Sequence, residues 1–545
     1  MSTFGYLTRV QKHTGRKTTC IYMIPSYLSQ EESKLLHRSQ RVIPEMERTM
    51  KPHLVLIPWI GGISHIIPMT DIGCLLASHG AAVTILTTPA NAPLVRSRVD
   101  RAALPHGGTG ITVTAIPFPA ADAGLPEGCE RLDLLRSPAD VPRFFTANKR
   151  FGEAVARYCR GDGGASSLPC RPTCIVAGMG HPWTLGLARE LGVPCYIFHG
   201  FGAFALLCIE HLFKHRPHEA VASPDELFDI PVLPPFECRV SRRQLPPHFL
   251  PSTSMGGGPL KQEMREFDVA VDGVVVNTFE ELEHGSTALL AAAAGKKVLA
   301  VGPVSLSHSP SLDAQTMSDD AWRCMAWLDT KAYKSVVYAS FGSAGCMPAA
   351  QLVQLGMALV SCPWPVLWVV KGADSLPDDA KKWLRENTDA DGVAGTKCLV
   401  VRGWAPQVPI LAHPAVGGFL THCGWGSTLE AVAAGMPMAT WPLFAEQFVN
   451  ERLIVDVLGV GVSVGVTKPT ENMLTASKTY GSEAEVEAEV GMEQVTEALE
   501  RLMDQGAEGE ERRRKAQELK LKAKGALEKG GSSYVNLENL IHSLV

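Results

Sequence analysis

Short runs of apolar, often β-branched residues alternate with helix-like segments along most of this chain. The first run is His53–Pro58, and a helix-like segment over Ile67–His79 separates it from the second run, Ala82–Thr87. Continuous apolar strands joined by helical crossovers are typical of parallel sheets that helices cover on both faces. The alternation therefore predicts a doubly wound α/β fold. Further runs of this kind are Cys174–Ala177, Cys195–Phe198, Val274–Asn277, Ser335–Ser340, Pro365–Val370, Lys397–Val401 and Gly417–Leu420.

A stretch rich in proline and serine interrupts the alternation near the middle of the chain. The chain has 545 residues, and single domains usually have about 100–200. We therefore expect two Rossmann-like domains that face a cleft, since ligands bind at the carboxyl ends of strands in open α/β sheets. The expected division is an N-terminal extension at 1–50, a first domain at 51–302, a linker at 303–318 and a second domain with a C-terminal helix at 319–545.

Residues 1–50 are polar and initially basic, unlike the rest of the chain, and we expect a disordered extension there. An organellar transit peptide is the alternative, because the first 30 residues contain many basic and few acidic side chains. A polar insertion between Val466 and Gly491 is expected to be a mobile surface loop.

Composition excludes several classes of function. A formal net charge of -5 gives no reason to expect nucleic acid as a partner. No apolar run reaches the roughly 18–20 residues that span a bilayer. The 14 cysteines are scattered without metal-binding spacing, so we expect reduced thiols in a cytoplasmic protein and no metal site. We also expect a monomer.

The segment from Trp404 to Gln447 concentrates residues suited to binding a nucleotide. A strand ending at Leu420 runs into the small and polar residues Thr421–Ser427, which open a helix. Backbone N–H groups and the positive end of a helix favour an anion such as a diphosphate. His422 and Ser427 add side-chain donors at the same place.

Other residues of this segment supply the remaining contacts that such a ligand needs. Trp404 offers a flat apolar face on which a base can stack, and Gln407 can read a pyrimidine edge. Glu430 lies one turn into the helix and can accept hydrogen bonds from ribose hydroxyls. Glu446 and Gln447 follow a strand, where they can bind sugar hydroxyls.

This segment resembles, nearly position by position, the signature box of the plant secondary-product glycosyltransferases. Members of that family have the GT-B fold, with two Rossmann-like domains. The resemblance covers about residues 51 to 545. Outside the signature box it includes Pro58–Pro68, His181–Trp183, His199–Phe201, Val276–Leu282, Trp327–Asp329 and Ser340–Ser343.

The resemblance implies a UDP-sugar site in the second domain and no cofactor beyond the donor substrate. A glutamine at the end of the box is associated with UDP-glucose. The donor-site residues implied in this way are Ser343, Trp404, Ala405, Gln407, His422, Trp425, Gly426, Ser427, Glu430, Glu446 and Gln447.

The resemblance also implies that His65 is the general base. A histidine titrates near neutral pH and can take a proton from an acceptor hydroxyl. His65 follows the first strand in a turn with Gly61 and Gly62, and this turn is one residue longer than the family pattern.

The chain departs from the family pattern at two positions. Gly178 stands where the family has an aspartate that orients the histidine, and Gly426 stands where it has an asparagine. Asp71 and His181 are candidates to replace the missing carboxylate. We expect an inverting transferase that moves glucose from UDP-glucose to a hydroxyl of a small lipophilic acceptor (a flavonoid, terpenoid, hormone or phenolic compound). The alternative is a UDP-sugar-binding pseudoenzyme.

Overall fold

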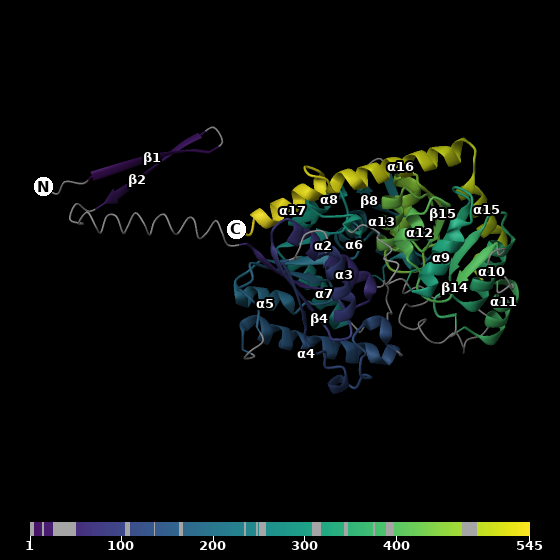
Figure 1. Cartoon of the computed structure of the whole chain (residues 1–545), viewed down its shortest axis with the longest axis horizontal. Coiled ribbons are helices and arrows are strands. Elements are labelled where there is room, and N and C mark those ends of the chain that lie inside the picture. The colour runs from purple at the N-terminus through teal and green to yellow at the C-terminus, as the bar shows by residue number, and fades with distance from the viewer. Residues whose placement is uncertain are drawn as a thin grey trace. The chain divides into compact units, whose positions relative to one another are not determined.

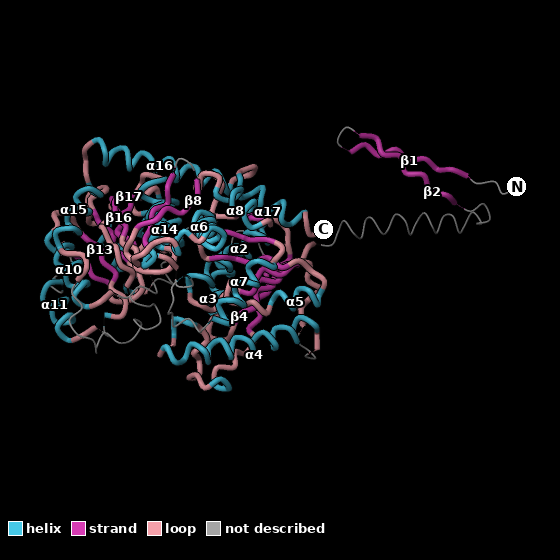
Figure 2. Tube along the Cα trace, turned by 180° about the vertical axis from the view of Figure 1, so that it is seen from behind, coloured by secondary structure: helices cyan, strands magenta, loops and turns pink. Residues whose placement is uncertain are grey.

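Two parallel sheets form the body of the chain between Pro52 and Leu544. Figure 2 shows their strands in magenta between cyan helices. This computed structural model describes residues 5–13, 16–24, 51–103, 110–135, 137–162, 167–233, 236–246, 249, 258–307, 318–342, 347–373, 376–388, 397–470 and 488–545.

The first sheet has seven parallel strands in the order β11-β10-β7-β6-β3-β4-β5. Strand order reverses between β3 and β6, so this is the switch point at which ligands bind in doubly wound folds. The apolar runs are buried, as a two-sided cover requires. The strands are β3 (His53–Ile57), β4 (Ala82–Thr87), β5 (Ile111–Ala115), β6 (Cys174–Gly178), β7 (Cys195–His199), β10 (Gly273–Val276) and β11 (Lys297–Ala300).

Helices cover both faces of the first sheet (Figure 1). One face packs against α2 (Ile63–Ser78), α3 (Ala92–Ala103) and α17 (Ser532–His542). The opposite face packs against α4 (Val141–Arg160), α5 (Thr184–Leu191), α6 (Ala203–His215), α7 (Gly258–Ala270) and α8 (Ser286–Ala294). An antiparallel pair, β8 (Leu227–Leu233) and β9 (Phe236–Ser241), and short helices at Ala121–Ala123, Leu132–Leu134 (η2), Pro138–Asp140 (η3), Pro217–Glu219, Arg242–Gln244 and Val304–Leu306 complete this part.

The second sheet has six parallel strands in the order β14-β13-β12-β15-β16-β17. The strands are β12 (Val336–Ser340), β13 (Val366–Val369), β14 (Cys398–Val401), β15 (Val416–Thr421), β16 (Met438–Thr440) and β17 (Gly461–Ser463). The helices are α9 (Asp319–Asp329), α10 (Ala349–Ser361), α11 (Asp378–Thr388), α12 (Gln407–Ala412), α13 (Trp425–Ala434), α14 (Gln447–Arg452), a π-helical turn (Leu453–Val457), α15 (Met492–Met503) and α16 (Ala507–Leu527). The predicted pair of doubly wound Rossmann-like sheets is therefore confirmed.

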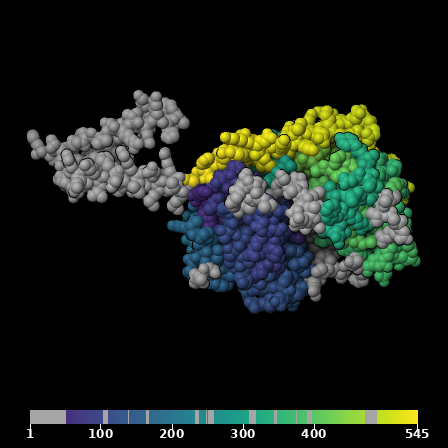
Figure 3. Space-filling view, in the orientation of Figure 1, coloured from purple at the N-terminus to yellow at the C-terminus, as the bar shows by residue number. Residues whose placement is uncertain are grey.

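The C-terminal helix α17 packs on the first sheet and not on the second. Leu537, Leu540 and Ile541 lie in the same apolar cluster as β3 and α2. Asn536 Nδ2 donates to the Ala300 carbonyl oxygen at 2.9 Å. Figure 3 shows the yellow C-terminal segment running over both purple-blue and green surfaces. The sequence assigned this helix to the second domain, because its apolar face does not reveal which sheet it covers.

The N-terminal residues and the polar insertion after Val466 differ in how far the structure describes them. Within Met1–Lys51, a separate unit, Gly5–His13 (β1) and Arg16–Ile24 (β2) pair as an antiparallel hairpin, where the sequence predicted a disordered extension. Most of the polar insertion after Val466 lies outside the described residues. No described helix is long and apolar enough to cross a membrane.

Candidate active site

His65 lies in the first turn of α2, beside the switch point of the first sheet. The backbone N–H groups of His65 and Ile66 donate to the Gly62 carbonyl oxygen at 3.1 and 3.4 Å. The helix therefore begins at Ile63, earlier than the predicted start at Ile67. His65 is thus held by helical geometry, whereas the sequence placed it in a turn.

The imidazole ring of His65 lies against Gly200, just beyond the end of β7. A Cβ atom on Gly200 would be 2.8 Å from both Cε1 and Nδ1 of His65, so a glycine is needed for this approach. The preceding residue, His199, is buried, and its Nε2 lies 2.9 Å from Asp268 Oδ1. Among the described residues, no group hydrogen-bonds to His199 Nδ1.

The surroundings of His65 keep its imidazole neutral. Burial and, to a smaller extent, the neighbouring His199 lower the pKa of His65 to about 4, while Asp133 acts in the opposite direction. The neutral ring is the form that accepts a proton. The side chain is only partly buried, so the ring is both neutral and accessible.

Trp59 occupies the space where the family aspartate would stand. A Cβ atom on Gly178 would lie 2.4 Å from the Trp59 backbone nitrogen, and one on Gly180 would lie 2.3 Å from the indole ring. A second glycine against the indole ring is Gly61, whose Cβ would lie 2.0 Å from the indole nitrogen. Trp59 therefore packs both against the turn that follows β3 and against Gly178 at the end of β6.

The two candidates for the missing carboxylate have other partners. Asp71 accepts two hydrogen bonds from Arg98, at 2.5 and 2.7 Å. The ring of His181 is buried against Trp59, and its Nε2 donates to the Pro58 carbonyl oxygen at 3.0 Å. The hydrogen bonds described here therefore join Asp71 to Arg98 and His181 to the turn after β3.

In the second sheet, His422 lies between the end of β15 and the N-terminus of α13. Its ring is enclosed by two glycines: a Cβ atom would lie 2.6 Å from the ring on Gly342 and 2.4 Å from Nε2 on Gly424. Burial lowers the pKa of His422 to about 4, and Nδ1 has no hydrogen-bond partner among the described residues. A neutral imidazole with an unused polar atom fits the predicted diphosphate contact.

Gln407 joins two more predicted donor-site residues into one network. Its Nε2 donates to Ser427 Oγ at 2.9 Å and to Glu430 Oε2 at 2.7 Å. Tyr338 OH donates to Gln407 Oε1 at 3.2 Å. The polar groups expected to face the nucleoside are therefore adjacent and mutually oriented.

Trp404 lies three residues before Gln407 in the chain. Its side chain is 71% exposed, which leaves a flat face for a base. The neighbouring Ala405 is buried. The arrangement has the form of a stacking platform beside hydrogen-bonding groups.

The two residues expected to bind the sugar lie at the start of α14. Glu446 is buried, which raises the pKa of its carboxyl to about 7, and it accepts a hydrogen bond from Asn450 Nδ2 at 3.2 Å. Gln447 Oε1 accepts from the backbone N–H groups of Leu443 and Phe444, at 2.9 and 3.1 Å. These bonds orient the Gln447 amide so that its Nε2 points away from the backbone.

Three further predicted residues have distinct placements. The Trp425 indole is buried and its Nε1 donates to the Asn277 carbonyl oxygen at 2.8 Å, so its side chain joins the two sheets. A Cβ atom on Gly426 would meet nothing within 4 Å, so this position at the helix start is open. Ser343 lies outside the described residues.

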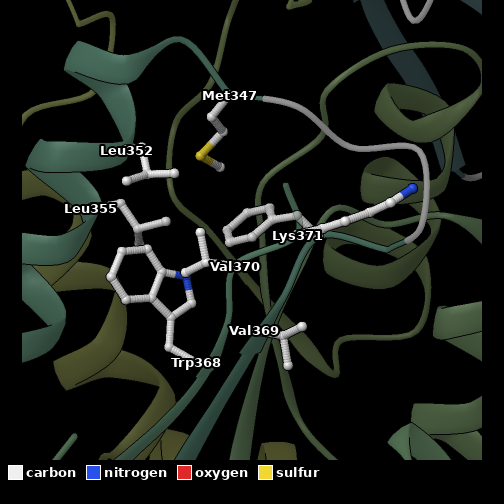
Figure 4. Close-up of a pocket in the computed structure, with 8 residues that line it drawn as sticks. Met347, Leu352, Leu355, Trp368, Val369, Val370 and Lys371 are labelled. Atoms are coloured by element: carbon white, nitrogen blue, oxygen red, sulfur yellow. The ribbon is translucent and has the colours of Figure 1, made fainter. Parts of the chain in front are cut away.

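A small apolar cavity in the second sheet is not a competing site. Figure 4 shows Trp368, Leu355, Leu352 and Met347 around it, with the Lys371 side chain extending away. Its volume of about 30 Å³ is far below the several hundred Å³ of a typical ligand pocket. This cavity is therefore too small and too apolar for a nucleotide.

Comparisons with known proteins identify the family of this chain. A family model described as UDP-glucoronosyl and UDP-glucosyl transferase matches residues 260–482. UDP-glycosyltransferase 73D1 from Arabidopsis thaliana is 37% identical over 94% of this chain and 99% of its own length. UDP-glycosyltransferase 73C7 from the same plant is 38% identical over 90% and 97% of the two chains.

Solved structures give the same result. The structure of Glycyrrhiza uralensis UGT73P12 with glycyrrhetinic acid 3-O-monoglucuronide is 33% identical, with a TM-score of 0.77 over 91% of this chain and 96% of that one. Medicago truncatula UGT71G1 with UDP-glucose, 24% identical with a TM-score of 0.68 over 91% and 98%, shares the fold. This chain therefore belongs to the plant UDP-glycosyltransferases, GT-B enzymes that transfer a sugar from a UDP-sugar to an acceptor.

Proposed function

We propose that this enzyme inverts configuration as it transfers glucose from UDP-glucose to a hydroxyl group of a small lipophilic acceptor, in the cytoplasm and as a monomer. The observation that carries the proposal is His65, a neutral and accessible imidazole held at the switch point of the first sheet. The acceptor classes to test are flavonoids, terpenoids, hormones and phenolic compounds.

In the proposed reaction the acceptor oxygen attacks the anomeric carbon of the donor. The bond from that carbon to the diphosphate oxygen breaks, and UDP leaves with the bonding electron pair. The hydroxyl proton passes to the unprotonated ring nitrogen of His65. The ring becomes an imidazolium and later releases the proton to solvent. Attack from the side opposite UDP inverts the anomeric configuration.

The donor would be held by the second sheet. Trp404 would stack on uracil, and Gln407 would contact the base edge. His422 and Ser427, with Ser343 as an expected further contact, would bind the diphosphate next to the α13 N-terminus, where the helix dipole stabilises negative charge. No metal or cofactor enters this proposal.

The remaining donor-site residues would bind the two sugars. Glu430 would accept from ribose hydroxyls and Glu446 from hydroxyls of the transferred sugar, whereas Gln447 would donate to that sugar through Nε2. The backbone at Ala405, Trp425 and Gly426 would border the nucleotide. The preference for glucose is supported by the glutamine at 447, which is the family residue associated with that donor.

The pseudoenzyme alternative is not favoured. The hydrogen bonds among Gln407, Ser427 and Glu430 support an intact donor site, and the relatives in the comparisons are named as transferases. Loss of the aspartate at 178 accompanies a repacked turn and leaves His65 accessible.

The test is turnover of UDP-glucose with a mixed panel of acceptors, following UDP release and product mass together. Glycyrrhetinic acid 3-O-monoglucuronide belongs in the panel, because a relative was solved with it. His65→Ala should reduce the transfer rate by about a hundredfold or more. The matched control is His542→Ala, which changes an exposed histidine at the end of α17.

A further inference from the structure

If His65 takes a proton, a positive charge develops on its ring within a partly buried site. A nearby carboxylate that stabilises this imidazolium lowers the barrier. The family supplies that carboxylate from the position of Gly178, and here Trp59 excludes it. A carboxylate that stabilises the His65 imidazolium in this chain must therefore reach it from another direction.

The short helix η2 (Leu132–Leu134) brings a carboxylate to the turn that carries His65. The Leu132 backbone N–H donates to the Ile60 carbonyl oxygen at 3.0 Å, which fastens η2 to this turn. A Cβ atom on Gly62 would lie 3.8 Å from Asp133 Oδ2. Asp133 thus stands directly beside the start of α2.

Arg131 fixes the orientation of the Asp133 carboxylate. Its Nε donates to Asp133 Oδ1 at 2.9 Å, and its Nη1 donates to Asn91 Oδ1 at 3.2 Å. Oδ2 is the oxygen that faces Gly62, and no described residue hydrogen-bonds to it. One oxygen is therefore anchored, while the other remains available to the His65 turn.

The charges around His65 act in opposite directions. His199, which is paired with Asp268 through Nε2, disfavours a charged His65. Asp133 favours the charged form of His65. Arg131 donates to Oδ1 of Asp133, the carboxylate oxygen that does not face Gly62. The groups on β7 and on η2 therefore flank the base with opposite electrostatic effects.

We propose that Asp133 is the positioning residue that stabilises the protonated form of His65, in place of the carboxylate excluded at Gly178. This inference rests on the proposed role of His65 as base. Asp133 would act through His65 and through the α2 N-terminus, without contact to the substrates.

A purely structural role is the rival interpretation, in which Asp133 only fastens η2 to the turn. The two roles differ in how they respond to the acidity of the acceptor. A less acidic hydroxyl needs more help from the base, so loss of imidazolium stabilisation should slow an aliphatic alcohol more than an acidic phenol. If Asp133 only fastens η2 to the turn, its loss should lower the transfer rates to the phenol and to the aliphatic alcohol by the same factor.

The experiment compares Asp133→Asn with Asp140→Asn, using UDP-glucose and two accepted substrates, one phenolic and one aliphatic. Asp140, at the end of the neighbouring helix η3, is a matched control because it also pairs with an arginine. Its Oδ1 lies 3.0 Å from Arg143 Nη1. Asp133→Asn should lower kcat about tenfold to a hundredfold with an unchanged KM for UDP-glucose. Asp133→Glu should restore part of this loss.

The ratio of the phenolic rate to the aliphatic rate decides between the two roles. It should rise at least about threefold in Asp133→Asn and stay at the wild-type value in Asp140→Asn. Because both rates come from one preparation, partial unfolding cancels in the ratio. An unchanged ratio, or a kcat within about twofold of wild type, would overturn the inference. If His65→Ala itself remained active, the proposed base would be wrong instead.

Discussion

Gly178 and Trp59 are in such close contact that no other residue fits at position 178. A Cβ atom on Gly178 would lie 2.4 Å from the Trp59 backbone nitrogen and 2.5 Å from its Cβ atom. Backbone atoms cannot rotate away as a side chain can. The absence of the family aspartate is therefore built into the path of the chain after β3, and one substitution will not reverse it.

We expect Gly178→Asp to destabilise the protein and to reduce its activity. Overpacking of a core typically costs about 1–3 kcal/mol, and a clash with backbone lies at the upper end. Gly178→Ala should show the same direction, because the Cβ atom alone causes the clash. The measurement is the urea midpoint of unfolding. Gly186→Ala on α5 is the control, since its Cβ would meet nothing within 4 Å. A stable and more active Gly178→Asp protein would contradict this packing.

Trp404→Ala should weaken UDP binding without changing stability. Stacking of a base on an aromatic ring contributes about 1–3 kcal/mol, so the dissociation constant should rise about fivefold to a hundredfold. The Trp404 side chain is 71% exposed, so its loss leaves no core cavity. Titration calorimetry with UDP measures the effect. Tyr333→Ala, which removes an aromatic ring that is 73% exposed, should bind UDP as wild type does. Equal affinities for Trp404→Ala and wild type would remove Trp404 from the donor site.

Two glycines near the α13 N-terminus should respond differently to substitution. Gly426→Asn should fold normally and bind UDP-glucose at least as tightly as wild type, because the position is open and the amide adds a hydrogen-bonding group. Gly424→Ala should weaken binding about tenfold, since its Cβ would lie 2.4 Å from His422 Nε2 and displace that ring. Affinity for UDP-glucose measures both. If Gly424→Ala bound UDP-glucose more tightly than wild type, the observed position of the His422 ring would not contribute to binding.

Buried His181 should make stability depend on pH. Burial lowers the pKa of His181 from 6.5 to about 4 in the folded protein. Between these values the unfolded chain binds a proton that the folded chain does not, so stability falls as the pH drops below 6.5. At about pH 5 this costs about 2 kcal/mol.

The comparison for this effect is His181→Gln, whose amide can still donate to the Pro58 carbonyl oxygen. Urea midpoints at about pH 7 and about pH 5 should differ less in this variant than in wild type. Because His65 and His422 also have pKa values lowered to about 4, part of the dependence should remain. An equal pH dependence in both proteins would mean that His181 is not held neutral.

Much of the fold could be predicted because the strands are buried on both faces. Runs such as Leu54–Ile57 are apolar throughout, a pattern typical of strands in a covered parallel sheet. The donor site stays a prediction, which was possible because Trp404, Gln407 and Glu430 lie in one segment of the chain. The hydrogen bond between Gln407 and Glu430 joins helices α12 and α13, which follow each other closely in the sequence.

Contacts between distant segments could not be predicted in the same way. Asp133 approaches the His65 turn across a long sequence separation, and the hydrogen bond from Leu132 to Ile60 helps to fix that approach. The apolar face of α17 is equally suited to either sheet, so its packing on the first sheet was missed. The space that Trp59 takes from position 178 depends on the three-dimensional path of the turn after β3.

The most direct test of this account is the initial rate of glucose transfer by wild type and His65→Ala, with each accepted substrate and saturating UDP-glucose. The account predicts a glucoside of inverted anomeric configuration from wild type, and a rate reduced by about a hundredfold or more in His65→Ala, with UDP affinity unchanged. Transfer by His65→Ala at the wild-type rate would contradict the assignment of His65 as the base.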